Sequence, residues 1–140
     1  MSFGFQLLKA GAEGPRLGCF TTPHGEVPTP AFMAVATRGM LRGISPSVLR
    51  PMGASIVLSN ALHLFLRPGP ETVRALGGVH GMLGWDGAVL TDSGGFQIFS
   101  LASLCRVTDV GVLYKDPVRG RILGTPEKAF EVQAALGPDV

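Results

Sequence analysis

The chain has 140 residues, of which 46% are hydrophobic and 16% charged, and its formal net charge is +2. The length is sufficient for one domain with a buried core, and the charge is too small to indicate a nucleic-acid partner by itself. Charged residues, glycine or proline interrupt every apolar run, so we expect a soluble, cytoplasmic protein without a membrane partner. The two cysteines, Cys19 and Cys105, lie far apart in the sequence, which favours reduced, buried thiols over a disulfide or a metal site.

Residues 1–27 are predicted to form a β-rich lead-in. The segments 3–8 and 16–20 flank a turn at Gly14-Pro15, a pattern typical of two short strands in a hairpin. The residues that follow are predicted to form a loop, in which His24 is a solvated turn residue.

Three apolar runs come next, each with the continuous hydrophobic character of a strand that is buried on both faces. They cover residues 30–36, 54–58 and 88–90. Each run ends abruptly in polar residues. These are Thr37-Arg38 after the first run, Ser59-Asn60 after the second and Asp92-Ser93 after the third.

Short helices and loops are predicted between the three runs. Ser45-Pro46 has the form of an N-cap followed by proline at the first helical position, and Gly53 is a plausible C-terminal stop. A second short helix is predicted over residues 71–76, and His80 is placed in the loop after it.

This alternation of strands with helices and loops predicts an α/β fold with a parallel sheet or barrel. In such folds, ligand sites lie beyond the carboxyl ends of the strands. The three polar clusters are therefore expected to share one face of the protein, which makes them candidates for a functional site.

The stretch Leu90–Gln97 carries the strongest functional signal. Asp92 could take protons from the edge of a flat ligand, and Gly94-Gly95 leaves no Cβ to keep such a ligand away from the backbone. Phe96 could cover the ligand's π-face. The alternative is a strand that ends in a Gly-Gly turn with Asp92 as its cap, but the shared face of the three polar clusters favours the functional interpretation.

The last forty residues contain a predicted hairpin and a predicted helix. The segments 111–115 and 120–123 flank a turn at Asp116-Pro117, which indicates two antiparallel strands. Thr125-Pro126 has the form of an N-cap and first helical residue, and Gly137 closes the helix. Residues 138–140 look like the beginning of a fourth parallel strand, so we expect a chain truncated at about that strand.

With Asp92 at a strand end in a β/α pattern, the sequence resembles the tRNA-guanine transglycosylases, also called queuine tRNA-ribosyltransferases. The segment Leu90–Gln97 resembles the family's base-binding signature. Further matches occur in the same order along the chain, at 28–33, Ser59-Asn60, 63–70, 78–81, Gly111-Val112 and 126–137. The resemblance implies a TIM barrel with a β-rich N-terminal addition. The expected fold is thus a partial TIM barrel, with residues 1–27 as the lead-in and 28–140 as the first β/α units.

The resemblance also implies an activity and its partners. The family exchanges the guanine at the wobble position of certain tRNAs for a 7-deazaguanine, a pentosyl transfer in queuosine biosynthesis. Asp92 resembles the family's proton-accepting aspartate, Ser93, Gly94 and Gly95 the loop that contacts the base, and Phe96 the aromatic residue that stacks on it. Asn60 resembles a polar residue near the ribose. Full-length members of the family bind zinc and dimerise.

The sequence departs from the family pattern at several points. Ala61 and Leu62 stand where the family has threonine and tyrosine. The family's nucleophilic aspartate and its C-x-C-x-x-C…His zinc site lie in a C-terminal half that has no counterpart here, so no metal ligand is assigned to this chain. We therefore expect part of a transglycosylase that is inactive alone. The alternatives are a catalytically inactive accessory protein that keeps the base pocket, and an unrelated β/α enzyme in which Asp92 acts alone.

Overall fold

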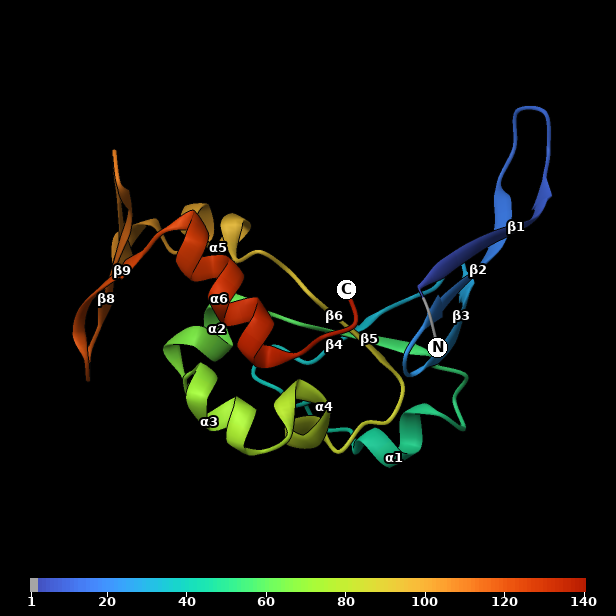
Figure 1. Ribbon diagram of the computed structural model, residues 1–140, viewed down its shortest axis with the longest axis horizontal. Helices are drawn as coiled ribbons and strands as arrows, with labels where there is room; N and C mark the ends of the chain where they lie inside the picture. Colours follow the sequence, from blue (N-terminus) through green and yellow to red (C-terminus); the bar gives the residue numbers. More distant parts are fainter. Residues whose placement is uncertain (1–2) are drawn as a thin grey trace.

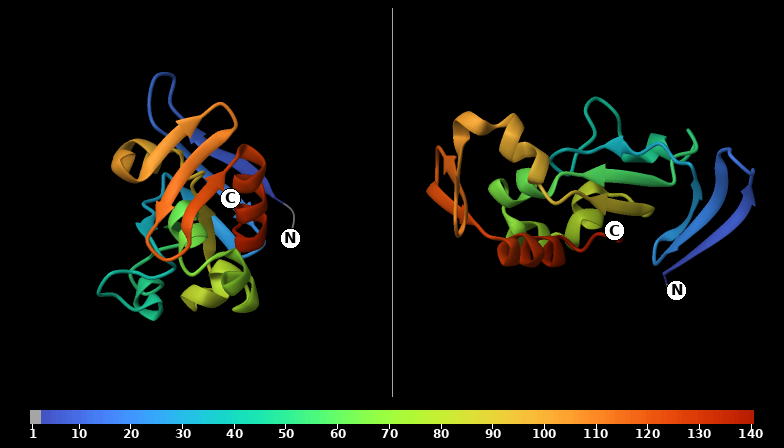
Figure 2. Two further views of the ribbon diagram at one scale, coloured as in Figure 1. Left: turned by 90° about the vertical axis from the view of Figure 1, so that its left-hand side faces the viewer. Right: turned by 90° about the horizontal axis from the view of Figure 1, so that it is seen from above.

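The computed structural model describes residues 3–140, which form an elongated α/β molecule with three small sheets. A parallel sheet lies in the middle, with one antiparallel sheet at each end of the molecule (Figure 1). The view from above in Figure 2 shows the helices gathered around the central sheet and the two antiparallel sheets standing apart from each other. No closed barrel is present in this part of the chain. Within the same residues, no helix is both long and apolar enough to cross a membrane.

The first sheet contains three antiparallel strands, β1 (Gly4–Ala10), β2 (Arg16–Thr22) and β3 (Gly25–Thr29). The predicted hairpin is confirmed as β1 and β2, but the loop predicted after it was wrong, since β2 extends to Thr22 and β3 begins at Gly25. The reason is a tight turn between β2 and β3. Gly25 adopts a φ of 120°, and the Thr22 hydroxyl donates to the Gly25 carbonyl at 3.0 Å.

The central sheet has the order β4-β5-β6, with all strands parallel, as the sequence predicts. Its strands are β4 (Ala34–Val35), β5 (Ile56–Ser59) and β6 (Ala88–Thr91). The strand β4 is much shorter than the apolar run 30–36, and Pro30, which has no N–H to donate, lies outside it. The core of the molecule lies against this sheet, where Val57 and Val89 are fully buried.

Four helices follow the first two central strands; in Figure 1 three of them lie below the central sheet, and α2 lies to its left. They are α1 (Pro46–Leu49), α2 (Ala61–Leu66), α3 (Pro70–Ala75) and α4 (Gly78–Leu83). The short helices α1 and α3 lie where they are predicted. Helix α4, however, contains His80, which the sequence placed in a loop. Gly77 and Gly78 look like a helix stop, but in the structure Gly77 precedes the first residue of α4 and both have positive φ.

After β6 the chain forms α5 (Gly95–Ser100), a single 3-10 turn (Ala102–Leu104) and the third sheet. This sheet consists of β7 (Cys105–Thr108), β8 (Gly111–Asp116) and β9 (Gly120–Gly124). The predicted hairpin is confirmed as β8–β9, and β7 is an additional strand. At the hairpin turn, Oδ1 of the Asp116 carboxylate accepts from the backbone N–H groups of Val118 (2.8 Å) and Arg119 (2.7 Å).

The last helix, α6 (Pro126–Leu136), begins and ends as predicted. The Thr125 hydroxyl accepts from the Lys128 N–H at 3.2 Å, and Gly137 adopts the left-handed conformation that ends many helices. The chain then returns to the edge of β6, where Asp139 N–H donates to the Val89 carbonyl at 2.8 Å. Thr91 N–H donates in turn to the Val140 carbonyl, also at 2.8 Å. Residues 139 and 140 therefore begin to pair with β6 as a further parallel strand would.

The two cysteines lie in different sheets, Cys19 in β2 and Cys105 in β7. Both are free thiols, as expected, but both are half-buried and not fully buried. Burial raises the pKa of the Cys105 thiol above its ordinary value, so this group is neutral at neutral pH.

Candidate active site

The candidate site lies where β5 and β6 end. Asp92 follows β6 and Asn60 follows β5, and the parallel pairing of these strands brings the two side chains together. The amide Nδ2 of Asn60 donates to Oδ2 of Asp92 at 2.6 Å. The Asp92 backbone N–H donates to the Ser59 carbonyl at 3.3 Å, which extends the sheet pairing past the last strand residue. The predicted meeting of these two polar clusters is confirmed.

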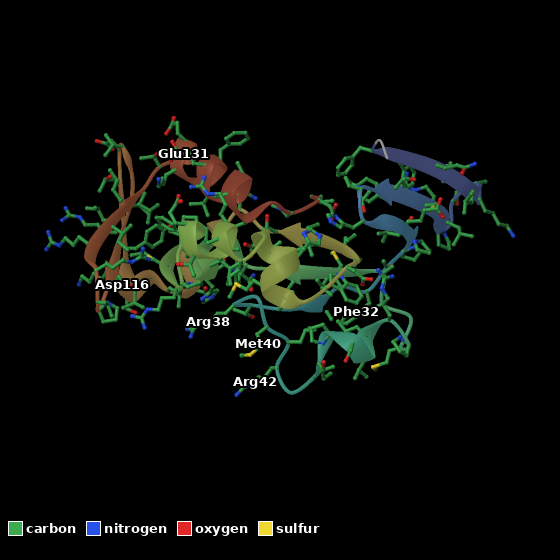
Figure 3. All side chains as sticks on the ribbon, turned by 60° about the horizontal axis from the view of Figure 1, so that its bottom comes forward. Phe32, Arg38, Met40, Arg42, Asp116 and Glu131 are labelled. Carbon is green, nitrogen blue, oxygen red and sulfur yellow. The ribbon has the colours of Figure 1, made fainter. Side chains whose placement is uncertain are left out.

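The third polar cluster remains separate. Arg38 lies in the loop after β4, and its side chain is exposed. Figure 3 shows Arg38, Met40 and Arg42 extending from this loop at the edge of the molecule. Arg38 is therefore at the expected end of the sheet but contributes nothing to the hydrogen bonds around Asp92.

Three N–H groups hold the Asp92 carboxylate in place. Besides Asn60, the backbone N–H of Ala61 donates to Oδ1 at 2.9 Å, and the side-chain Nε2 of Gln97 donates to Oδ2 at 3.1 Å. Ala61 is the first residue of α2, so Asp92 satisfies one of that helix's free N–H groups. Asp92 thus caps a neighbouring helix, and the alternative in which it caps its own Gly-Gly turn is wrong. A carboxylate offers about four acceptor positions, so one remains for a ligand.

The first glycine of the signature, Gly94, is required by the local geometry. Gly94 has a φ of 77°, and a Cβ atom at this position would lie 2.9 Å from the Cβ of Leu62. A side chain here would therefore be strained and would collide with α2. Gly95 begins α5, and its N–H donates to the Ser93 hydroxyl at 3.3 Å. Together these residues turn the chain sharply from β6 into α5.

The aromatic ring expected to stack on a ligand lies on the outer side of this turn. Phe96 is in the first turn of α5, with 76% of its surface exposed. Such exposure of a large apolar side chain leaves its ring face free for a planar ligand. That Phe96 stacks on a base remains a prediction.

A cavity of about 270 Å³ lies behind the signature, between α2, α5, α6 and the third sheet. Leu62, Ser93, Gly94 and Tyr114 are among its lining residues, whereas Asp92 and Phe96 are not. The predicted site residues are thus divided between the cavity and the outer side of the turn. Burial, followed by the nearby Cys105 thiol, raises the pKa of the Tyr114 phenol, which keeps this group protonated at neutral pH.

Two glutamines of the site were missed by the sequence reasoning. Gln97 donates to Asp92, and its Oε1 is buried without a hydrogen-bond partner among the described residues. Gln133 of α6 donates to the Asp92 carbonyl at 3.2 Å and to the Thr91 hydroxyl at 3.3 Å. In the sequence, Gln97 could have been noted as the polar residue directly after the aromatic residue of the signature. Gln133 could have been noted as the polar residue next to Val132 of α6, which is buried.

Another group of polar side chains, distinct from the three clusters at the strand ends, lies near the beginning of β6. It is about three residues before Asp92, at the opposite end of the strand. It contains His24, His80 and Asp139, whose ligand atoms all lie within 4.8 Å of one another. The prediction that His24 is only a solvated turn residue was wrong, because its Nδ1 is 2.8 Å from Oδ1 of Asp139. No residue of this cluster was a predicted site residue.

Fold and site together define an α/β protein in which hydrogen bonds fix a carboxylate, that of Asp92, beyond the ends of parallel strands. The family model described as "Queuine tRNA-ribosyltransferase" matches residues 12–140, so the chain belongs to that family. This membership excludes the unrelated β/α enzyme. A protein of this name from Synechococcus sp. (strain CC9311) is 54% identical over 128 residues, which are 91% of this chain and 34% of that protein.

Two further relatives of the same name match the chain almost completely. A protein from Thermus thermophilus is 49% identical over 139 residues, covering 99% of this chain and 36% of the relative. The protein from Desulforudis audaxviator (strain MP104C) is 49% identical over 142 residues, covering 100% of this chain and 38% of the relative. The chain therefore spans about a third of the length of the curated relatives it matches.

Proposed function

We propose that this chain supplies the guanine-binding part of a tRNA-guanine transglycosylase. The complete reaction would exchange the wobble guanine of tRNA for a 7-deazaguanine in queuosine biosynthesis. The names of the relatives support this activity and favour an enzyme over an inactive accessory protein. The observation that carries the proposal is the Asp92 carboxylate, held by three N–H donors with an acceptor position left over.

We further propose that residues 28–140 are the first β/α units of a TIM barrel, preceded by the β-rich lead-in 1–27. The order β4-β5-β6 is sequential and parallel, as in such a barrel. The backbone of residues 139 and 140 hydrogen-bonds to β6 on the edge that a fourth barrel strand would occupy. Asp92 would then lie at the carboxyl face, where active sites of this fold are found.

Asp92 would act as the proton acceptor beside the bound base. Guanine presents N–H donors along one edge, and a carboxylate is a strong acceptor for such groups. The incoming base must give up a ring N–H proton as it bonds to the glycosidic carbon, and a positioned carboxylate that accepts this proton lowers the barrier of that step. In a retaining exchange, a second carboxylate attacks the ribose. We assign no residue of this chain to that role.

The other signature residues would place the base against Asp92. Gly94 and Gly95 would let it approach the backbone closely, with the Ser93 hydroxyl nearby, and Phe96 would stack on its face. Asn60 orients the Asp92 carboxylate directly and would lie toward the ribose.

We assign no ligand of the family's expected zinc site to this chain. A site of three thiolates and one imidazole needs more cysteines than Cys19 and Cys105, which lie in the sheets at opposite ends of the molecule (Figure 1). Ligands of that zinc site would therefore depend on residues beyond those matched here.

Equilibrium binding of free bases to the purified chain tests the proposal. We expect guanine and 7-deazaguanine to bind more tightly than adenine, because adenine presents an acceptor where guanine presents N–H donors to Asp92. Calorimetric titration would measure the difference. The variant Asp92→Asn should remove the preference for guanine, while Asp109→Asn, which changes an exposed carboxylate outside the signature, should retain it. Equal affinity for adenine and guanine in the folded parent chain would overturn the assignment of Asp92.

A further inference from the structure

The cluster at the opposite end of β6 joins three segments that are distant in the sequence. His24 lies in the turn between β2 and β3, His80 lies in α4, and Asp139 follows α6. Oδ1 of Asp139 is 2.8 Å from Nδ1 of His24, and Oδ2 is 3.0 Å from Nε2 of His80. Oδ2 also accepts from the backbone N–H of Val89 at 2.8 Å.

Burial in the cluster decreases from the carboxylate to the outer imidazole. The side chain of Asp139 is 1% exposed, that of His80 is 12% exposed and that of His24 is 41% exposed. Solvent therefore reaches the cluster from the side of His24. The two imidazole rings are stacked, with their centroids 3.8 Å apart and 20° between their planes.

We propose that His24, His80 and Asp139 form a binding site for a divalent transition-metal ion of the Zn²⁺ class. Two imidazole nitrogens and one carboxylate oxygen are ligands that such ions commonly take, and a water molecule on the exposed side would complete a four-coordinate site. The Val89 N–H would hold the second carboxylate oxygen in place, as hydrogen bonds around bound metals commonly do.

Metal binding would replace the two histidine–carboxylate hydrogen bonds. Each neutral imidazole would coordinate through the nitrogen that now faces Asp139 and would carry its proton on the other ring nitrogen, so no net proton or electron is needed. The stacked rings require His24 to turn toward the ion. Its position in an exposed turn permits this rotation, whereas His80 and Asp139 are fixed by α4 and by the pairing with β6.

The site would stabilise the fold and take no part in base exchange. Val89, whose N–H donates to Asp139, precedes Asp92 by three residues of extended chain, which is about 10 Å along the strand. A bound ion would connect the first sheet, through His24, to α4 and the edge of β6. The donor set of two imidazoles and one carboxylate also differs from the thiolate site of the family, so this proposal stands independently of the proposed function.

Titration of the metal-free chain with Co²⁺ and Zn²⁺ tests the proposal. After treatment with a chelator and a thiol reductant, the chain should bind one equivalent of Zn²⁺ by calorimetry. Co²⁺ should produce the visible absorption of a site with nitrogen and oxygen ligands, without a thiolate charge-transfer band. Zn²⁺ should also raise the melting temperature, because an ion that binds only the folded state stabilises it.

Four variants identify the ligands. His80→Gln and Asp139→Asn should weaken Zn²⁺ binding at least about tenfold. His24→Gln should also weaken Zn²⁺ binding. Because it changes only an exposed turn residue, it can test the proposal if the other two variants fail to fold. His63→Gln, which alters the third histidine of the chain, should bind Zn²⁺ like the parent. The proposal is overturned if the folded parent binds no Zn²⁺, or if His24→Gln and His63→Gln bind it equally well.

Discussion

Two carboxylates lie near the two ends of β6, and their surroundings differ in kind. Asp92 is half-buried and receives hydrogen bonds from two side-chain amides and one backbone N–H. Asp139 is almost completely buried and is contacted by two imidazoles and one backbone N–H. Amides are neither acids nor bases near neutral pH, so Asp92 is held in place without a competing acid or base. Asp139 instead joins two imidazole side chains from distant segments of the chain.

The two kinds of surroundings indicate different roles for the two carboxylates. A carboxylate that is oriented only by amides remains available to accept a proton from a substrate. A carboxylate shared between two imidazoles is suited to joining segments or to holding a cation. The following variants test that distinction.

The largest effect is expected for Asp92→Asn in base exchange. Because the chain spans about a third of its relatives, the measurement needs a chimaera in which it replaces the matching part of the Thermus thermophilus protein. Asparagine keeps the size of the side chain but removes the proton acceptor, so turnover should fall by roughly 10²–10⁴-fold. Incorporation of labelled guanine into tRNA would measure it.

The same variant also tests the purely structural role of Asp92. An asparagine at this position can still accept from the Ala61 N–H, so the cap on α2 can persist. Asp109→Asn is the matched control, because it removes an exposed carboxylate outside the signature. If turnover of Asp92→Asn stayed within a few-fold of the parent, Asp92 would be only a helix cap.

A smaller effect, on stability and not on exchange, is expected for Asp139→Asn. Burial raises the pKa of Asp139, but the hydrogen bonds from His24 and Val89 and the charges of His24 and His80 lower it more, so its net pKa lies below the ordinary 3.8. A carboxyl group with a lowered pKa in the folded state contributes stability above its unfolded pKa, and that stability is lost as the pH falls through the folded value. The contribution should therefore be complete at neutral pH and should be lost progressively as the pH falls below about 4.

Urea denaturation between pH 3 and 7, in the presence of a chelator, would measure this contribution. Removing hydrogen bonds to a charged acceptor should cost roughly 1.5–3 kcal/mol at pH 7, and the acid-side loss of stability should be flatter than in the parent. Asp86→Asn is the comparison, since Asp86 also has a lowered pKa, first through its hydrogen bond from Arg50, but is exposed. Exposed ion pairs contribute little, so equal losses in the two variants would argue against a special role of Asp139.

The contacts of the two ends also differ in how far sequence could predict them. Strand β5 and strand β6 each end in a polar cluster, and parallel pairing requires these ends to meet, so the contact of Asn60 with Asp92 followed from the pattern. The contact of Gln97 with Asp92 did not, because it depends on α5 beginning at Gly95.

At the other end, no local pattern indicated a cluster. His24 and Asp139 are 115 residues apart, and their contact depends on how the first sheet packs against the central strands. His80 was placed in a loop because the glycines around it look like helix breakers. In the structure a Cβ atom at Gly81 would lie 2.0 Å from the Leu76 carbonyl oxygen, so this glycine reflects close packing between α3 and α4. A close approach of this kind between two helices cannot be predicted from the residues on either side of the glycine.

The smallest effect is expected for Phe96, on the outer side of the signature turn, and it concerns the binding of the base. Phe96→Ala removes an exposed ring without disturbing any of the three hydrogen bonds to Asp92. Base binding should weaken by about 1–3 kcal/mol, the usual contribution of one aromatic stack, while turnover in the chimaera should change little. The Michaelis constant for free guanine would report this loss. Phe130→Ala is the matched control, because Phe130 in α6 is 75% exposed but lies outside the signature. If both variants bound guanine like the parent, the base would not stack on Phe96, and the apolar cavity behind the turn would be the better candidate for the base.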